Sequence, residues 1–325
     1  MRKVINILSI VTLLSAAVSC VKSDRIDDNS RSEIDMDPVM SVMSKAIVSG
    51  TGYPVDVPFG VFATYSSNPA GEWTSGPVQS YFENKEFSHK GDNKYGGDAY
   101  WPLSGSLVFA GYSPYYPDSG SVSATFDAET KTLSISNFVS NGQTDLMYFL
   151  PTLSNSGNYV GTLDKSNSVS AQFFHALSLV EFNVKGVDND VTVKLKDITF
   201  KNIPRMGTLT ADASGCSWGD LSSPDDLPVF SSDDDDDDDG ELSSETPVTA
   251  TSLVIPGSAV DIDLAYDVVG ATSHEKTGTI TPGNAVTEWV AGKKYIYNLT
   301  IRSGFIVVES VTTSYIAENE SGIEI

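Results

Sequence analysis

The chain has 325 residues, a formal net charge of −23, and only 19% charged residues. This acidic balance excludes nucleic acid as a partner, because binding to a phosphate backbone depends on clustered Lys and Arg. The length is sufficient for two domains of ordinary size, and a composition rich in Ser, Thr, Gly and Val favours strands and turns over helices.

The N-terminus predicts secretion. A basic start is followed by the apolar stretch Val4–Leu14, and the small residues Ser15–Ser19 lead into Cys20. This order is typical of a secretory signal peptide, and the apolar stretch is shorter than the ~20 residues of a transmembrane helix. We therefore assign residues 1–19 to a signal peptide. Without its two cations, the remaining chain has a net charge of −25.

The small residues before Cys20 resemble the lipobox of bacterial lipoproteins, in which the signal is cut before a cysteine that is then acylated. The resemblance implies lipidation of Cys20, a polar tether over residues 20–32, and attachment to the outer membrane at the bacterial cell surface. Two or three acyl chains anchor a protein stably, at ~0.8 kcal/mol per buried methylene. The alternative is an ordinary cleaved signal followed by a chance cysteine. Acylation would leave Cys216 without an intrachain disulfide partner.

From Glu33 onward, short runs of alternating apolar and polar residues are bounded by Gly, Pro, Asn and Ser. Such runs are typical of half-buried strands, and helical periodicity is nearly absent after the signal. We therefore predict an all-β fold. The expected strands include residues 57–65, 106–112, 132–138, 172–184, 191–200, 251–255, 260–268, 288–301 and 305–314.

A turn-rich stretch at residues 186–190 separates two of the longest strand signals. We expect it to divide the chain into an N-terminal β-sandwich, 33–186, and a C-terminal β-sandwich, 187–325. The second sandwich carries a predicted acidic loop at residues 231–245, which contains seven consecutive aspartates.

Several local patterns resemble those of one family, the fimbrillins, which are pilus subunits of Bacteroidetes (type V pili). The patterns are Tyr100-Trp101-Pro102 with Leu107–Pro114, Phe174–Val180, Ile198–Ile203, and Trp289–Tyr297. The resemblance runs over nearly all of the mature chain. It implies two tandem transthyretin-like β-sandwich domains and a structural or adhesive subunit of cell-surface fimbriae. Its implied partners are other fimbrial subunits, the outer membrane through the lipid, and a host or bacterial receptor.

The resemblance also implies assembly by β-strand donation. Residues 33–43 carry enough apolar character for an edge strand that fills a groove of its own domain, and Pro38 suits an edge because it has no N–H. A protease cut between Lys45 and Ala46 would release this strand together with the lipid, and Arg31 is the fallback site. The alternative is a permanent first strand in an uncut anchor or simple lipoprotein.

The predicted donor is the strand at residues 305–314, whose apolar residues include Ile306, Val307 and Val308. A donated strand binds through main-chain hydrogen bonds and through side chains that enter a partner's groove. The same strand would therefore complete the opened sheet of the next subunit.

The alternative function is a monomeric surface lipoprotein that binds glycan or a host ligand. Exposed aromatics at Trp73, Tyr115 and Tyr116 would then act as stacking platforms, although loop or core packing explains them equally. For His175 we expect a packed or hydrogen-bonded core histidine rather than a ligand-binding one.

Two motifs suggest chemistry that their surroundings do not support. Residues 215–219 match the G-x-S-x-G elbow of esterases, but no helical pattern follows, so we expect no enzyme and no cofactor. Asp235, Asp237 and Asp239 match the start of a calcium loop, but position 246, where the closing Glu should lie, is Thr. We expect a solvated loop swollen by like-charge repulsion, with loose calcium binding as the alternative.

Overall fold

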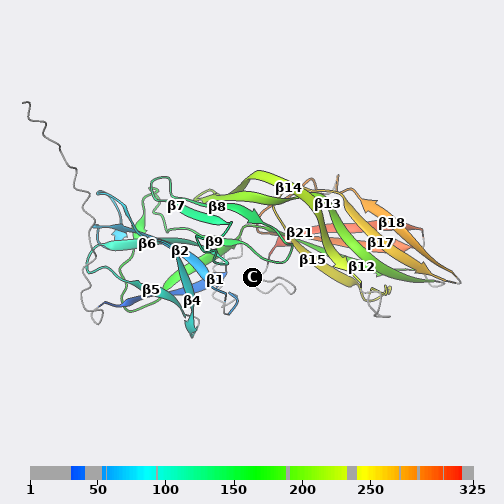
Figure 1. Ribbon diagram of the computed structural model, residues 1–325, viewed down its shortest axis with the longest axis horizontal. Helices are drawn as coiled ribbons and strands as arrows, with labels where there is room; N and C mark the ends of the chain where they lie inside the picture. The colour runs from blue at the N-terminus through cyan, green and yellow to red at the C-terminus, as the bar shows by residue number, and fades with distance from the viewer. Residues whose placement is uncertain are drawn as a thin grey trace, which may run out of the picture. The chain divides into compact units, whose positions relative to one another are not determined.

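The computed structural model describes residues 31–40, 53–55, 57–92, 94–187, 191–232, 240–270, 272–283, 286–302 and 304–316. These residues form strands joined by turns and contain no helix (Figure 1), so the prediction of an all-β fold is confirmed. Within them, no helix is long and apolar enough to cross a membrane. From Ser32 onward the described residues belong to one compact unit.

Seven of the described strands form a sheet that closes on itself, in the order β1-β11-β9-β6-β2-β4-β5. Alternate residues point inward and build a core of aromatic rings in mutual contact, among them Phe59, Phe149 and Phe173. The strands are β1 (Glu33–Met40), β2 (Phe59–Ser66), β4 (Gln79–Gly91), β5 (Lys94–Tyr100), β6 (Ser106–Ser113), β9 (Met147–Phe149) and β11 (Val169–His175).

The remaining long strands form two further sheets around a second core. A four-stranded sheet has the order β15-β12-β20-β21, with β12 (Ser178–Gly186), β15 (Val248–Val254), β20 (Lys293–Arg302) and β21 (Phe305–Tyr315). A six-stranded sheet has the order β18-β17-β13-β8-β7, and its sixth strand, β14, pairs with β13. Its strands are β7 (Ser123–Asp127), β8 (Thr132–Val139), β13 (Thr192–Asp212), β14 (Gly215–Ser231), β17 (Ile262–Val269) and β18 (Ser273–Ile280). Their shared core includes Phe182, Phe200 and Trp289. Two small sheets pair β3 (Gly71–Glu72) with β10 (Val160–Gly161) and β16 (Gly257–Ser258) with β19 (Glu288–Trp289).

The division into two sandwich domains after residue 186 stays a prediction. The strand pairing does not follow that line, because β12 lies hydrogen-bonded between β15 and β20, and β8 pairs with β13. A third apolar cluster joins side chains from the closed sheet to side chains from the other sheets, with Tyr148, Phe138 and Leu253 as examples. The apolar interior is therefore shared along the unit.

A long hairpin connects these parts. β13 and β14 pair antiparallel from Asp197–Ser231 to the turn at Asp212–Gly215 (Figure 1). In the turn, the Asp212 carboxylate accepts a hydrogen bond from the Ser214 N–H at 2.8 Å, and Gly215 has a positive φ of 124°. Near the turn, the Trp218 indole N–H donates to the Ala176 carbonyl at 2.8 Å. The turn is thereby held close to the end of β11.

Candidate functional site

The first described strand, β1, is built into the core of the closed sheet. Its burial alternates along its whole length, with Ile34, Met36, Pro38 and Met40 buried and the residues between them half-buried. This period of two follows directly from strand geometry. The strand therefore does fill the interior of its own sheet.

β1 is not an edge strand, so that part of the prediction is wrong. It pairs in parallel with β11 over Met36–Met40 and antiparallel with β5 over Glu33–Met36. The physical reason is closure, because a sheet that closes on itself has no free edge. Pro38 is tolerated because the pairing with β5 ends at Met36, so at Pro38 β1 pairs only with β11.

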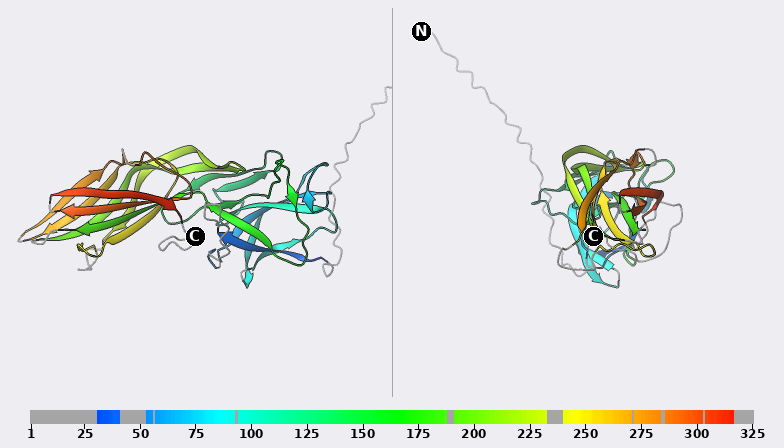
Figure 2. Two further views of the ribbon diagram at one scale, coloured as in Figure 1. Left: turned by 180° about the vertical axis from the view of Figure 1, so that it is seen from behind. Right: turned by 90° about the vertical axis from the view of Figure 1, so that its right-hand side faces the viewer.

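The last described strand, β21, is the edge of the four-stranded sheet (red in Figure 2), and the predicted strand at 305–314 is found at 305–315. Among the described strands it pairs only with β20, from Lys293–Tyr315 to Arg302–Phe305. Three of its apolar side chains are exposed: Phe305 by 57%, Val308 by 42% and Tyr315 by 42%. The donor candidates Ile306 and Val307 are half-buried.

Two contacts hold β21 in place beyond its ladder. Ile306 packs so close to Gly278 of β18 that a Cβ there would come within 2.5 Å of its Cδ1 atom. After the strand, Ile316 is only 1% exposed and lies in the shared cluster, and its N–H donates to the Gly292 carbonyl at 3.1 Å. Sequence reasoning missed Ile316 because a single apolar residue after a strand carries no periodic signal.

Several predicted site residues lie outside the described residues: Cys20, Lys45, Ala46, Asp235, Asp237 and Asp239. Arg31 is described and exposed, and the carbonyl of the next residue, Ser32, accepts the Trp101 N–H at 3.0 Å. Within the part of the chain that is described, no three His, Cys, Asp or Glu side chains converge as metal ligands.

The predicted acidic loop at 231–245 includes residues that are firmly bonded. The Ser232 N–H donates to the Lys196 carbonyl at 2.9 Å, and the Gly240 carbonyl accepts the Leu195 N–H at 2.7 Å. Gly240 has a positive φ of 81°, and a Cβ there would lie 2.2 Å from the Leu195 oxygen. Ser232 and Gly240, which flank the aspartate run, are thus hydrogen-bonded to the backbone of β13. The composition of the loop does not predict these bonds.

The aromatics predicted as glycan platforms are largely built into the fold. The prediction is wrong for Trp73, which is 6% exposed; its indole N–H donates to the Ser106 hydroxyl at 2.7 Å. Tyr116 is half-buried and stacks on Tyr112, with ring centroids 6.1 Å apart, and burial raises the pKa of Tyr116 to about 12. Tyr115 is half-buried as well.

His175 is a buried, hydrogen-bonded core residue, as expected. Its Nδ1 atom pairs with the Oδ2 atom of Asp145, which is fully buried. The other carboxylate oxygen, Oδ1, has no hydrogen-bond partner in the structure. Because a buried carboxylate is costly without a partner, this pair fixes the end of β11 against the loop that precedes β9.

The G-x-S-x-G match at residues 215–219 lies within β14, at the start of a strand that continues to Ser231. An esterase elbow needs a tight turn from a strand into a helix, so this stretch does not have the elbow geometry. Cys216 in the same stretch is half-buried, and burial raises the pKa of its thiol.

Together, the fold and the site define an all-β protein whose first strand is locked in a closed sheet and whose last strand is an open edge. The chain belongs to the fimbrillin-like family, whose model matches residues 50–317. No curated protein sequence matches the chain.

Solved structures with the same fold come from several species of Bacteroides. A fimbrial protein from Bacteroides vulgatus is 18% identical, with a TM-score of 0.59 and coverage of 88% of this chain and 99% of that one. A putative cell adhesion protein from Bacteroides ovatus is 12% identical, with a TM-score of 0.54 and coverage of 89% and 100%. One from Bacteroides uniformis is 16% identical, with a TM-score of 0.53 and coverage of 88% and 98%.

Proposed function

We propose that this chain is a structural subunit of a cell-surface fimbria, exported as an outer-membrane lipoprotein and polymerised by β-strand donation. Membership of the fimbrillin-like family supports the pilus role. The assembly model rests on one observation: β1 is bonded on both sides and places four buried residues in a closed sheet. Its removal would leave a groove one strand wide. The role is mechanical, and we assign no catalysis to it.

Loss of β1 would expose both faces of such a groove. The backbone of β11 at 169–173 and of β5 at 95–100 would lose hydrogen-bond partners, and the buried rings of Tyr95 and Phe173 would meet water. Unpaired buried backbone groups and exposed apolar surface are both unfavourable. A donated strand that runs in the direction of β1 would lie parallel to β11 and antiparallel to β5. It would restore the backbone hydrogen bonds and cover the apolar side chains.

β21 fits the role of the donor. It has eleven residues, against eight in β1, and its register places Ile306, Val308 and Val311 opposite the buried side chains of β20. Among the described strands it has one neighbour, so its release breaks a single ladder. Its exposed apolar side chains would become buried in the groove of the next subunit.

The two candidate cleavage sites are not equivalent in this fold. Arg31 precedes β1, so a cut there would remove the lipid and leave the strand in its sheet. Lys45 follows β1, so a cut before Ala46 would release the strand together with the tether and the lipid on Cys20. Only the second cut opens the groove.

N-terminal sequencing of fimbriae sheared from the cell surface tests this model. We expect a start at Ala46, and we expect Lys45→Gln to accumulate as unpolymerised precursor. Arg31→Gln is the matched control and should polymerise normally. Filaments whose subunits all begin at acylated Cys20 would overturn strand exchange at β1.

The donor is tested separately with Val308→Asp, which places a charge on an exposed side chain that the groove would have to bury. The monomer should keep its melting temperature within a few degrees, while filaments seen by negative-stain microscopy should disappear. Thr312→Asp is the control, because Thr312 is exposed on the opposite face of β21. Equal polymerisation of both variants would rule out β21 as the donor.

Lipid attachment is tested at Cys20. We expect Cys20→Ala to abolish labelling with radioactive palmitate and to release soluble protein into the periplasm. Labelling that persists in this variant would remove the lipoprotein part of the proposal and leave the strand exchange to be judged on its own tests.

A further inference from the structure

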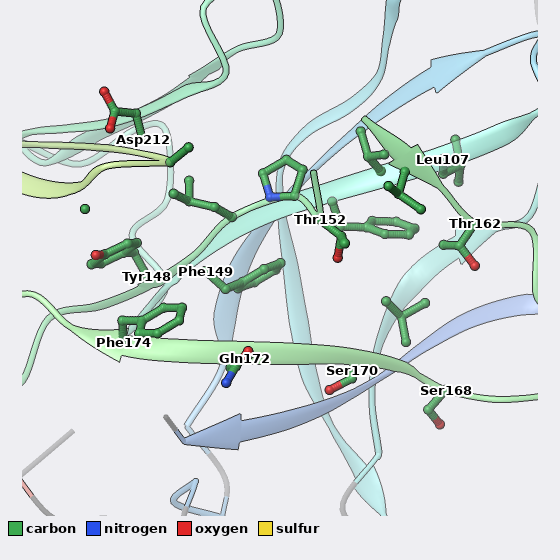
Figure 3. Close-up of a pocket in the computed structure, with 18 of the residues that line it drawn as sticks. Leu107, Tyr148, Phe149, Thr152, Thr162, Ser168, Ser170, Gln172, Phe174 and Asp212 are labelled. Atoms are coloured by element: carbon green, nitrogen blue, oxygen red, sulfur yellow. The ribbon is translucent and has the colours of Figure 1, made fainter. Parts of the chain in front are cut away.

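The closed sheet has a gap beside its shortest strand. β9 has three residues and lies between β6 and β11, paired with Gly111–Ser113 on one side and with Phe174–His175 on the other. After Phe149 the chain leaves the sheet, but β6 and β11 both continue past this point. A cavity of about 780 Å³ lies between the two continuing strands (Figure 3).

The width of the gap matches one strand. Neighbouring strands lie ~4.8 Å apart, so β6 and β11, each one spacing from β9, are held ~9.6 Å apart at the end of β9. Figure 3 shows Ser168, Ser170 and Gln172 along β11 on one side of the cavity, with Leu107 and Thr162 on the other. On β6 the gap runs from Gly111, which pairs with Phe149, to Leu107, which is bridged to Thr162. A segment of about three residues in line with β9 would therefore have a strand on each side.

Backbone groups on both sides point into the gap. On β6, the N–H and carbonyl of Leu107 bond to Thr162. Because backbone direction alternates along a strand, those of Phe109 face the same side. On the other side, the Ala176 N–H donates to the Leu146 carbonyl, so by the same alternation Ser170 directs its backbone toward the gap and away from β1.

The floor of the gap is apolar, and its rim combines polar side chains with apolar ones such as Val108 and Leu150. Leu107, Phe109 and Phe149 form the floor and are at most 5% exposed. The rim carries hydroxyl groups from β11 and from the segments 150–152 and 162–168. This division suits an extended peptide, whose successive side chains point to opposite faces. The rings of the floor are packed edge-on in the core and offer no open face on which a saccharide could stack.

The charge of the rim restricts the peptide further. Among the described residues, Asp164 and Asp212 are the charged ones that line the cavity, and both are half-buried residues at turns. Hydrogen bonds from Asn167 and Ser166 hold the pKa of Asp164 at about 2, and those from Ser214 lower the pKa of Asp212. Both carboxylates are ionised at neutral pH, so a basic peptide is attracted and an acidic one repelled.

We propose that the gap between β6 and β11 is a strand-addition site for an extended segment of a partner protein, about three residues long between the two strands. The segment alternates small apolar and polar side chains and carries Lys or Arg at its ends. The site lies on the side of β11 opposite β1, so it is open while β1 is in place. It therefore functions independently of the strand exchange proposed above.

Hydrogen exchange of the mature chain tests the open edges directly. In the free protein, the amides of Phe109 and Ser170 should exchange at least 100-fold faster than those of Gly111 and Phe174, which lie two and four residues further along the same strands. Addition of the synthetic peptide acetyl-KVTVTK-amide at millimolar concentration should slow both amides. Strong protection of Phe109 and Ser170 in the free protein would overturn the proposal, because the gap would then be filled.

Selection of a phage-displayed hexapeptide library on the same chain tests the recognition. Enriched peptides should alternate apolar residues between basic ones, and Ser170→Pro should weaken their binding at least tenfold, because proline removes the N–H that faces the gap. Ser170→Ala is the control and should bind normally. The melting temperature of Ser170→Pro should stay within a few degrees of wild type, which separates lost binding from lost folding.

Three outcomes of the selection would contradict the proposal: no enrichment, enriched peptides that bind Ser170→Pro and wild type equally, or enriched peptides without alternation. Binding of neutral oligosaccharides on a glycan array that Ser170→Pro abolishes would also overturn it, and would assign the cavity to sugars instead.

Discussion

The first and last described strands of this chain are held in opposite ways. β1 is bonded on both sides and buries alternate side chains in the closed sheet, whereas β21 is bonded on one side and leaves Phe305, Val308 and Tyr315 exposed. Burial of one large apolar side chain contributes about 1.5–3 kcal/mol, so β1 contributes several kcal/mol through side chains alone. β21 depends mainly on its backbone ladder and on two contacts near its ends.

This contrast supports the proposed strand exchange, because the two strands suit different steps of it. A strand that is integral to a core leaves behind a high-energy groove when it is removed, which drives its replacement. A strand at an open edge can leave with little cost to its own sheet.

The support of β1 depends on β11, and Asp145 fixes the end of that strand through His175. We expect His175→Ala to cost about 3–5 kcal/mol, because it leaves the fully buried Asp145 carboxyl group without its partner. Glu309→Ala on the exposed edge of β21 is the comparison and should change stability by less than ~0.5 kcal/mol. Urea denaturation measures both, and similar values for the two would contradict the contrast.

Within β1 itself, Met36 is fully buried. Met36→Ala should cost about 2–5 kcal/mol through lost burial and the cavity left behind. On β21, Val308→Ala removes a side chain that is 42% exposed and should cost less than ~1 kcal/mol. If thermal unfolding gives the larger loss for Val308→Ala, the contrast between the two strands is reversed.

The end of β21 is the exception to its exposure, because Ile316 is buried in the shared cluster. We expect Ile316→Ala to cost about 2 kcal/mol and to speed hydrogen exchange of the β20 amides that face β21. Phe305→Ala, at the other end of the strand, should leave both quantities nearly unchanged, because Phe305 is 57% exposed. Unchanged exchange in Ile316→Ala would show that the ladder alone retains the strand.

In the acidic segment, Gly240 should contribute to stability, whereas the seven aspartates should not. Gly240→Ala should cost about 1 kcal/mol or more, because its positive φ and the nearby Leu195 oxygen leave no room for a Cβ. Replacement of Asp233–Asp239 by serine should change stability by less than ~0.5 kcal/mol in calcium-free buffer. A calcium-dependent rise in melting temperature that the serine variant loses would instead establish metal binding.

The strands were predictable where alternation is strong, as in β12, because the period of two depends on local geometry alone. Closure of the first sheet was not predictable, since it depends on pairing between β1 and β5, whose partners lie about sixty residues apart. The prediction that β1 is an edge strand was wrong for this reason. Pro38 suggested an edge because it has no N–H, but in the structure only its own position is paired on one side.

The candidate site residues were likewise predictable only where their roles depend on neighbours in the sequence. The role of His175 was predictable from its apolar neighbours, but its partner Asp145 was not, because the pair depends on how two distant segments meet. For Trp73 the sequence left a platform and a packed ring equally open, because an aromatic residue beside Gly and Glu has no signal that separates them. The short β9, and with it the gap beside β11, was not predicted, since three residues are too few to show periodicity.

The open edge of β21 also governs how the unpolymerised protein behaves as a colloid. Exposed edge strands are templates for uncontrolled pairing between molecules, and the apolar residues at this edge increase that tendency. The chain carries a net charge of −23, so two molecules repel each other before their edges meet. Salt shortens the range of this repulsion to ~8 Å at physiological strength and ~3 Å at 1 M. The precursor is therefore expected to remain monomeric in dilute buffer and to self-associate as the salt concentration rises.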